Sequence, residues 1–176
     1  MHKKSTLLKK PIKKVAVVYR PGRKATSKIA SEVAQWLMER KIKVYSHPKR
    51  KFKVNSKQIP VCTKPKELDL IVVLGGDGTY LEAVRLIEGS KVPILGINMG
   101  SLGFLTENRL ENLYPSLEMT LNGKMEACPR SMLKVKVKNG KSSKEFLALN
   151  DVVIERGARS HLIDLEVFSE KNFVCN

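Results

Sequence analysis

The chain has 176 residues, of which 42% are hydrophobic, and it carries a formal net charge of +16. This length and composition suffice for one sizeable domain, or for one compact domain and part of a second. No apolar run is long enough to cross a membrane, and the basic N-terminus is not followed by the apolar segment of a secretory signal. We therefore expect a soluble, cytoplasmic protein with no membrane partner.

The N-terminal third of the chain is strongly basic. Residues 1–66 hold 20 of the 33 Lys and Arg residues and only two of the 17 acidic residues, Glu32 and Glu39. Such an excess would suit a nucleic-acid partner. However, the lysines alternate with apolar residues or lie in polar loops, and no aromatic residues are interleaved with them. We therefore predict a basic leader at residues 1–11 and a solvated basic surface that attracts anionic nucleotides, with no specific nucleic-acid site.

Strands and helices are predicted to alternate between residues 12 and 123. Apolar runs predict strands at 14–19, 42–46, 69–74 and 92–97. Apolar residues at helical spacing predict helices at 25–40, 80–88 and 110–121, the last of which either starts at Pro115 or is kinked there. A long polar loop is expected between the second and third strands. This alternation favours an α/β nucleotide-binding domain with a parallel sheet, spanning residues 12–123.

A glycine turn, Gly75-Gly76-Asp77-Gly78-Thr79, directly follows the apolar strand at 69–74. Its glycines permit a close approach that side chains would block. Thr79 is expected to cap a helix that begins near Tyr80, so that the N–H groups of the turn and the helix dipole attract a phosphate. The candidate residues of this phosphate loop are Gly75, Gly76, Gly78 and Thr79.

The carboxylate of Asp77 is poorly suited to bind an anion, although it lies within this turn. We therefore expect Asp77 to take a proton or to hold a metal while its neighbours hold the phosphate, which is an arrangement for phosphoryl transfer. The alternative is a structural aspartate that caps its own turn, a common use of this residue.

A second glycine-rich loop, residues 96–105, follows the fourth predicted strand. Neighbouring parallel strands deliver the loops at their carboxyl ends to one edge of the sheet, where ligands of open α/β sheets bind. We therefore expect this loop to lie beside the glycine turn. The alternative is a plain connection between a strand and a helix.

The hydrophobic period changes after residue 123. Strands are predicted from strict alternation at 132–138, from an extended segment at 145–155 and from renewed alternation at 161–169. A turn at Asn139-Gly140 separates the first two. A turn at 170–172 and a return strand from Phe173 complete the pattern. We interpret residues 124–176 as the first strands of a β-rich second domain. That domain would be incomplete, because the last short strand would leave an open sheet edge.

Three motifs together resemble NAD kinases: Gly75-Gly76-Asp77-Gly78-Thr79, the segment from Gly96 to Thr106, and Leu149-Asn150-Asp151-Val152-Val153. A similar glycine turn occurs in lipid kinases of the diacylglycerol and sphingosine type, whereas the Leu102-Gly103-Phe104-Leu105 loop and the Asn-acid pair favour NAD kinase. The family usually has Asn-Glu where this chain has Asn150-Asp151. Family members also continue beyond the strand that contains Phe173 into a Thr-Gly-Ser-Thr-Ala-Tyr stretch that completes the NAD site, which this sequence lacks.

The resemblance implies ATP-dependent phosphorylation of the adenosine ribose 2′-hydroxyl of NAD to give NADP, with a divalent cation, Mg²⁺, as cofactor. By this resemblance Asp77 is the general base and contacts NAD. The other implied NAD contacts are Gly78, Phe104, Asn150, Asp151 and His161. The resemblance also implies a homo-oligomer for the full-length protein, and it assigns no metal ligand.

Simpler interpretations remain for several of these residues. Phe104 could belong to the core, the pair Asn150-Asp151 could form a bulge, and His161 could be an ordinary surface residue. At the level of function, the alternatives are a lipid kinase domain and a nucleotide-binding fragment without catalytic activity.

Overall fold

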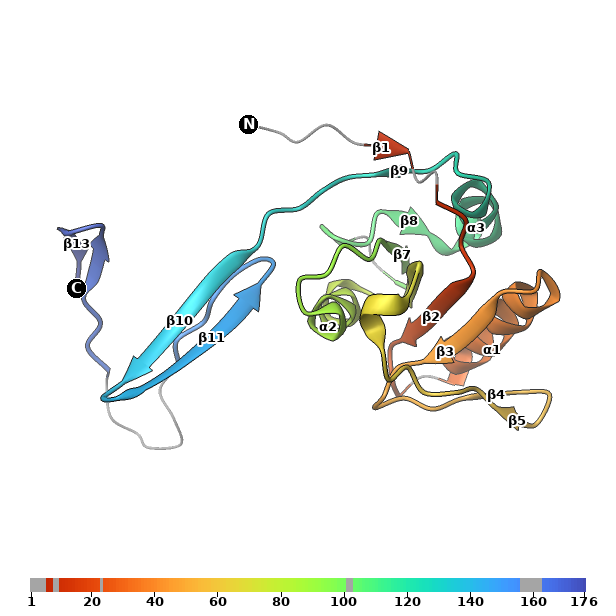
Figure 1. Cartoon of the computed structure of the whole chain (residues 1–176), viewed down its shortest axis with the longest axis horizontal. Helices are drawn as coiled ribbons and strands as arrows, with labels where there is room; N and C mark the ends of the chain where they lie inside the picture. Colours follow the sequence, from red (N-terminus) through yellow and green to blue (C-terminus); the bar gives the residue numbers. More distant parts are fainter. Residues whose placement is uncertain (1–5, 8–9, 23, 101–102, 156–162) are drawn as a thin grey trace.

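The structure is a computed structural model that describes residues 6–7, 10–22, 24–100, 103–155 and 163–176 (Figure 1). A single sheet contains β2 (Lys14–Tyr19), β3 (Lys43–Ser46), β6 (Leu70–Leu74), β7 (Ile94–Asn98) and β8 (Asn108–Arg109). The helices are α1 (Lys24–Glu39), α2 (Asp77–Ile87) and α3 (Leu113–Leu121). The strands pair in parallel in the order β3-β2-β6-β7-β8, which confirms the predicted α/β class.

Both faces of the sheet are buried, so its central strands carry unbroken apolar runs. Val15, Val17 and Val72 face a core that includes residues of α1 and α3. Their neighbours Ala16 and Ile71 face a second core that includes residues of α2. Alternate residues of one strand thus pack against helices on opposite sides of the sheet. Figure 1 shows α2 on one side and α1 with α3 on the other.

The strand order places a topological switch point between β2 and β6. The chain leaves β2 toward β3 on one side and returns through β6 on the other side of β2. Crossover connections therefore diverge at the carboxyl ends of these two strands, which is where open α/β sheets bind ligands. The glycine turn at residues 75–79 directly follows β6 and lies at this position.

The predicted start of the helix after the glycine turn was wrong. Helix α2 begins at Asp77, three residues before Tyr80, and its N-cap is Gly76 rather than Thr79. Thr79 is instead buried against the turn, since a Cβ atom added at Gly75 would lie 2.4 Å from its hydroxyl oxygen. The threonine therefore packs inward, and the extended backbone of Gly76 makes the transition into the helix.

Short elements account for the remaining parts of the α/β region. The segment predicted as a loop contains a hairpin of β4 (Lys53–Val54) and β5 (Lys57–Gln58) and a 3₁₀ turn at Pro65–Glu67. A second 3₁₀ turn at Leu110–Asn112 precedes α3. Pro115 is the third residue of α3, where its missing N–H costs no intrahelical hydrogen bond. The helix therefore starts at Leu113, two residues before the proline and three residues after the predicted position 110.

The C-terminal part of the chain consists of two-stranded antiparallel pairs. Strand β9 (Glu126–Ala127) pairs with β1 (Thr6–Leu7), β10 (Leu133–Asn139) with β11 (Ser142–Ala148), and β12 (Val167–Ser169) with β13 (Asn172–Cys175). The prediction of extended strands at 145–155 and 161–169 was too long, because residues 151–155 and 163–166 form no strand. Large apolar side chains of these hairpins are exposed, among them Phe146 and Phe173.

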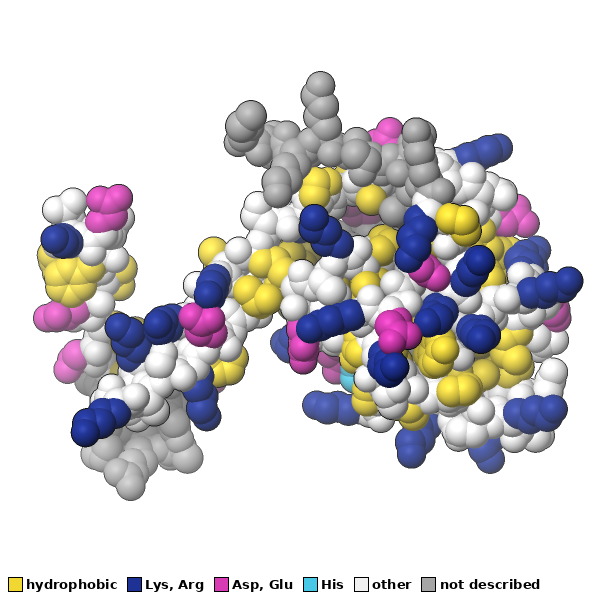
Figure 2. Space-filling view, viewed as in Figure 1, with side chains coloured by type: hydrophobic (Ala, Val, Ile, Leu, Met, Phe, Trp, Pro, Cys, Tyr) yellow, Lys and Arg dark blue, Asp and Glu magenta, His cyan; other side chains and the backbone are white. Residues whose placement is uncertain are grey.

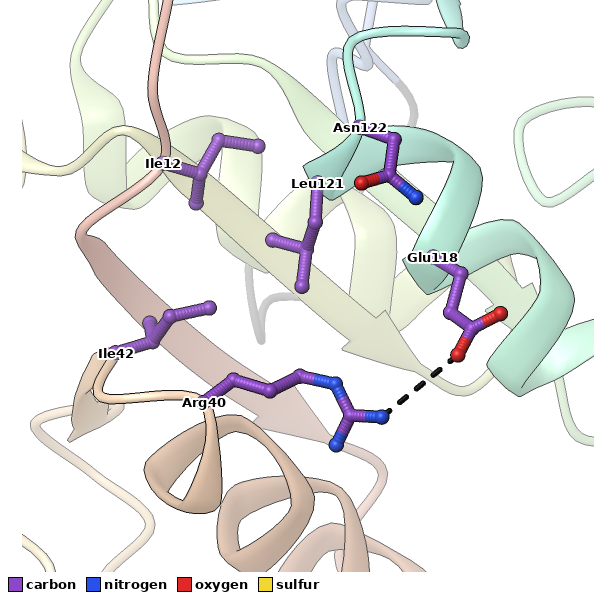
Figure 3. A pocket seen from close by; sticks show the side chains of 6 residues that line it. All are labelled: Ile12, Arg40, Ile42, Glu118, Leu121 and Asn122. Atoms are coloured by element: carbon purple, nitrogen blue, oxygen red, sulfur yellow. Dashed lines mark ion pairs between the residues drawn. The ribbon is translucent and has the colours of Figure 1, made fainter.

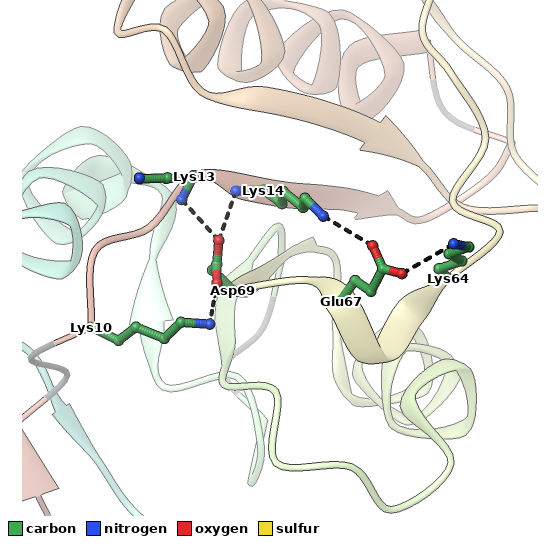
Figure 4. Close-up of polar contacts among 6 residues, drawn as sticks. All are labelled: Lys10, Lys13, Lys14, Lys64, Glu67 and Asp69. Carbon is green, nitrogen blue, oxygen red and sulfur yellow. Dashed lines mark hydrogen bonds and ion pairs between the residues drawn. The ribbon is translucent and has the colours of Figure 1, made fainter.

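The beginnings of the two central strands are joined by one carboxylate. Asp69, which is 9% exposed, accepts hydrogen bonds of 3.0 Å from the backbone N–H groups of Lys13 and Lys14 and pairs with Lys10 Nζ at 2.6 Å (Figure 4). These donors hold the pKa of Asp69 below its usual value although burial acts in the opposite direction. Glu67 is half exposed, and its partners among the described residues are the side chains of Lys14 and Lys64.

We expect Asp69→Ala to destabilise the fold by about 1–3 kcal/mol, because it leaves backbone N–H groups at the start of β2 without an acceptor. Glu67→Ala is the matched control and should leave stability unchanged, since its ion pairs are exposed. Urea unfolding of both variants measures the difference. Equal losses of unfolding free energy in the two variants would show that the hydrogen bonds from the backbone to Asp69 add no stability beyond that of an exposed ion pair.

The basic segment after β3 is fixed to α2. Arg50 forms a two-bond ion pair with Glu82 of α2, and the neighbouring His47 is 7% exposed. The Nδ1 atom of His47 accepts a hydrogen bond of 3.1 Å from the N–H group of Lys49. Burial lowers the pKa of His47 below its ordinary value of 6.5, and the charge of Arg50 adds to this effect.

Because the pKa of His47 is lower in the folded chain than in the unfolded chain, acidification below about pH 6.5 should weaken the fold. As the pH falls, the unfolded chain binds the proton first, so the stabilisation that comes from keeping His47 neutral is fully present above that pH. It is lost as the pH falls, with a slope of at most about 1.4 kcal/mol per pH unit. His47→Asn keeps an acceptor but does not titrate, so its unfolding free energy should change less between pH 7.5 and 5.5. Equal changes in unfolding free energy for the two proteins over this pH range would contradict this expectation.

No helix in the described part of the chain is long and apolar enough to cross a membrane. Lys and Arg side chains are spread widely over the visible face of the α/β region (Figure 2). Several of the acidic residues take part in ion pairs with them, including Glu32 with Lys28 and Glu118 with Arg40. This distribution agrees with the predicted basic surface.

Candidate functional site

The glycine turn is anchored to the strands on both sides of it. The N–H group of Gly75 donates to the carbonyl of Ile97 on β7 at 3.0 Å, and the N–H group of Arg20 after β2 donates to Leu74 at 2.9 Å. The first N–H groups of α2 have no partner within the helix, as at any helix N-terminus. They face the switch point together with the positive end of the helix dipole, which favours the binding of an anion there.

The carboxylate of Asp77 joins the two glycine-rich loops. Its Oδ2 atom accepts a hydrogen bond from the N–H group of Phe104 at 2.9 Å. Its Oδ1 atom accepts bonds from the N–H groups of Leu105 at 3.0 Å and Thr106 at 3.3 Å, and from the Thr106 hydroxyl at 3.2 Å. The prediction that the second loop lies beside the glycine turn is therefore confirmed.

These contacts keep Asp77 ionised. Burial raises the pKa of its carboxyl group, but the hydrogen bonds from Leu105, Phe104 and Thr106 outweigh burial and hold the pKa below its usual value. A carboxylate oxygen accepts about two hydrogen bonds, so Oδ1, with three donors, has no capacity left. Oδ2 has one donor among the residues that the structure describes and can accept a bond from a further hydroxyl. The simpler interpretation of Asp77 as an aspartate that caps only its own turn does not describe these contacts with residues 104–106.

The glycines of the two loops fall into two groups. A Cβ atom at Gly75 or Gly103 would collide with a neighbour, and at Gly103 it would lie 2.3 Å from Oδ1 of Asp77. A Cβ atom at Gly76, Gly78 or Gly100 would meet nothing within 4 Å. The first group is needed for packing within the described chain. The second group leaves open space through which a ligand can approach the backbone.

The predicted NAD-binding residues are not all brought together. Phe104 is 91% exposed beside Asp77, so it is not a core residue. Asn150 and Asp151 are exposed in the segment after β11, and among the described residues no hydrogen bond joins them to the glycine turn. His161 lies outside the described residues. The roles of these four residues stay predictions.

Two hollows in the described part of the chain lie away from Asp77. One of about 490 Å³ is lined by Ile12, Ile42 and the ion pair of Arg40 with Glu118 (Figure 3). It lies where β2 and β3 begin, at the opposite edge of the sheet from the glycine turn. The other, of about 620 Å³, lies between the end of α2 and the hairpin of β10 and β11.

The described residues contain no group of three or more His, Cys, Asp or Glu side chains that could hold a metal ion. The side-chain chemistry at the glycine turn is therefore that of one carboxylate with backbone N–H groups around it. Such a site can bind a phosphate at the helix N-terminus and orient a hydroxyl group at Oδ2.

Comparison with known proteins decides the family. Residues 15–125 match the family model of the ATP-NAD kinase N-terminal domain. The chain belongs to the NAD kinase family. The resemblance that the three sequence motifs indicated is therefore confirmed. The glycine turn and the loop beside it both lie within the residues that match the family model.

Relatives match this chain along most of its length. It is 45% identical over 174 residues to the NAD kinase of Bdellovibrio bacteriovorus, covering 98% of this chain and 57% of the relative. It is 42% identical over 158 residues to the NAD kinase of Geobacter sulfurreducens, covering 88% of this chain and 55% of the relative. The chain therefore spans little more than half the length of these curated relatives.

A solved structure supports the fold. The crystal structure of yeast NADH kinase complexed with NADH superposes with a TM-score of 0.77, covering 95% of this chain and 55% of that chain. Sequence identity is 24%, so this likeness shows the fold alone.

We expect Gly103→Ala to be less stable than Gly100→Ala by about 1–3 kcal/mol. The added methyl group at Gly103 would displace the Asp77 carboxylate, whereas the one at Gly100 enters open space. Both substitutions restrict the unfolded chain to the same degree, so their difference isolates the contact. Urea unfolding measures it. Equal stability would contradict the close packing of the second loop on Asp77.

Proposed function

We propose that this chain contains the phosphoryl-transfer site of an NAD kinase that uses ATP to phosphorylate the adenosine ribose 2′-hydroxyl of NAD, giving NADP. The observation that supports it best is the Asp77 carboxylate, held at the N-terminus of α2 by the second loop with Oδ2 still able to accept a hydrogen bond. Membership of the NAD kinase family supports ATP as the donor and NAD as the acceptor.

The donor phosphates would bind at the glycine turn. Their negative charge suits the N-terminus of α2, and the open faces of Gly76 and Gly78 allow close approach to the backbone. The buried Thr79 and Gly75 hold the turn in shape rather than meeting the ligand directly. The basic surface around the α/β region would raise the local concentration of anionic nucleotides.

The acceptor hydroxyl would donate a hydrogen bond to Oδ2 of Asp77. A bond forms between the ribose oxygen and the γ-phosphorus of ATP, the bond from that phosphorus to the β-phosphate oxygen breaks, and ADP leaves with the electron pair. The hydroxyl proton passes to Asp77. Because the pKa of Asp77 is low, we expect it to orient the hydroxyl first and to take the proton only as the new bond forms.

The other contacts with NAD are carried from the resemblance as proposals. Phe104 is exposed beside Asp77, as a residue that meets a ligand must be. Gly78, Asn150, Asp151 and His161 complete the proposed set. Cytoplasmic location and assembly into a homo-oligomer also stay predictions from the sequence.

Mg²⁺ is the cation that the family resemblance implies. The described residues do not form a cage for a resident metal ion, so the ion would be carried mainly by the phosphates of the donor, as is usual for Mg²⁺. When bound, it would neutralise phosphate charge. We assign it no ligand from this chain.

The direct test is to incubate the 176-residue chain with NAD, ATP and Mg²⁺ and to measure NADP. Phosphorylation of diacylglycerol or sphingosine is measured in the same preparation, because lipid kinases have a similar turn. NADP formation supports the proposal. Phosphorylated lipid without NADP overturns it, and a shift of thermal stability by ATP without turnover indicates a nucleotide-binding chain without catalytic activity.

Asp77→Asn should lower the rate of NADP formation by about two to four powers of ten, because the amide cannot take the proton. Its oxygen can still accept the hydrogen bonds from Leu105 and Thr106, whereas its NH2 group cannot accept the one from Phe104. Glu111→Gln, an exposed position on the 3₁₀ turn before α3, is the control and should keep the original rate. Steady-state kinetics with saturating ATP measure both variants. A rate unchanged by Asp77→Asn would assign this residue a structural role only.

A further inference from the structure

A buried chain of polar groups reaches Asp77 from the end of β7. Asn98, the last residue of β7, is 4% exposed, and Thr106 is fully buried. The N–H group of Gly100 donates to Asn98 Oδ1 at 2.7 Å, and Asn98 Nδ2 donates to Thr106 Oγ1 at 2.9 Å. Thr106 Oγ1 lies 3.2 Å from Oδ1 of Asp77. The sequence motifs point to Asp77 but assign nothing to Asn98 or Thr106.

The direction of these hydrogen bonds follows from the backbone. The N–H group of Gly100 can only donate, so the atom of Asn98 that faces it must be the carbonyl oxygen. The amide nitrogen of Asn98 therefore faces Thr106 and donates to its hydroxyl oxygen. The single hydroxyl proton of Thr106 is left for the carboxylate of Asp77, which can only accept.

This fixed direction makes the two oxygens of Asp77 unequal. Among the described residues, Oδ1 receives the Thr106 hydroxyl and two backbone N–H groups, whereas Oδ2 receives one donor, the N–H group of Phe104. Tilting the carboxylate away from this orientation would separate the Thr106 hydroxyl from its acceptor in a buried place, where an unpaired polar group is costly, whereas a half turn only exchanges two equivalent oxygens. The chain of donors thus fixes where the available oxygen lies.

We propose that Thr106 is a positioning residue, whose hydroxyl, aligned by Asn98, holds Oδ1 of Asp77 and so presents Oδ2 to the acceptor hydroxyl. This inference rests on the proposed function for its catalytic consequence. Its structural part, the hold on one oxygen of the carboxylate, stands on the contacts alone. Thr106 does not touch the substrate in this scheme and acts only through Asp77.

The methyl group of Thr106 offers a competing explanation. A Cβ atom at Gly96 would lie 3.1 Å from Thr106 Cγ2, so the methyl group is also closely packed. Thr106→Val keeps the shape and loses the hydroxyl, whereas Thr106→Ser keeps the hydroxyl and loses the methyl group. The two variants therefore separate hydrogen bonding from packing.

The experiment measures the titration of the Asp77 carboxyl group by NMR of the carboxyl-labelled chain, together with kcat and KM for NADP formation. Thr106→Val should raise the midpoint of the Asp77 titration by about half a pH unit or more, since a donor to the charged form is lost. It should lower kcat about tenfold or more, because the reacting oxygen is misplaced, and leave KM for ATP unchanged. Thr106→Ser should stay within about twofold of the unmodified chain in kcat and keep its midpoint.

An unchanged midpoint and kcat in Thr106→Val would overturn the proposal. Equal losses in both variants would also overturn it, because they would assign the effect to packing. If the unmodified chain forms no NADP, the proposed function fails, while the NMR titration still decides whether Thr106 holds Asp77.

Thr106→Val could fail to fold, because it removes the buried hydrogen bond between Asn98 Nδ2 and Thr106 Oγ1. The unmodified chain then provides a second measurement. A buried hydroxyl that donates to a carboxylate exchanges slowly with water, so the Thr106 hydroxyl proton should give its own NMR signal with a contact to the labelled Asp77 carboxyl group. Rapid exchange of this proton would contradict the proposal.

Discussion

One ionised carboxylate holds the two loops of the site together. Asp77 lies at the first position of α2, where the helix dipole favours negative charge. It accepts hydrogen bonds from three consecutive residues, 104–106, at the end of the second loop and directly after it. Without this anion, the N–H groups of residues 104–106 would lose their acceptors, and the hydrogen bonds that hold the second loop against the turn would be lost. Gly103 is a glycine for the same reason, since only a hydrogen atom fits beside the carboxylate.

Much of this arrangement could be predicted from the sequence. Apolar runs located the four main strands, and their alternation with helical segments indicated a parallel sheet with loops at one edge. The juxtaposition of the two glycine-rich loops follows from that topology alone. The expectation held because strands buried on both faces carry a strong and unambiguous hydrophobic signal.

The remaining features depend on tertiary contacts that a linear pattern does not contain. Threonine is a favoured N-cap, but the space beside Gly75 takes the side chain of Thr79, and Gly76 becomes the cap instead. Asn98 and Thr106 are eight residues apart and meet only because the loop folds back onto Asp77. In the C-terminal part, alternation overextended the strands, since alternation marks a strand only where a neighbouring strand completes its hydrogen bonds.

The division of the glycines has a consequence for how sequence variation in this motif should be interpreted. A side chain at Gly75 or Gly103 would collide with the interior of the protein, whereas the space beside Gly76 and Gly78 is open, and under the proposed function a nucleotide would occupy it. Substitutions at Gly75 or Gly103 should lower the cellular abundance of the protein, whereas substitutions at Gly76 or Gly78 should leave it unchanged. Under the proposed function, substitutions at all four positions should lower nucleotide turnover. Neighbouring glycines of one short motif would thus be required for different reasons, Gly75 for folding and Gly76 for the proposed binding of the nucleotide.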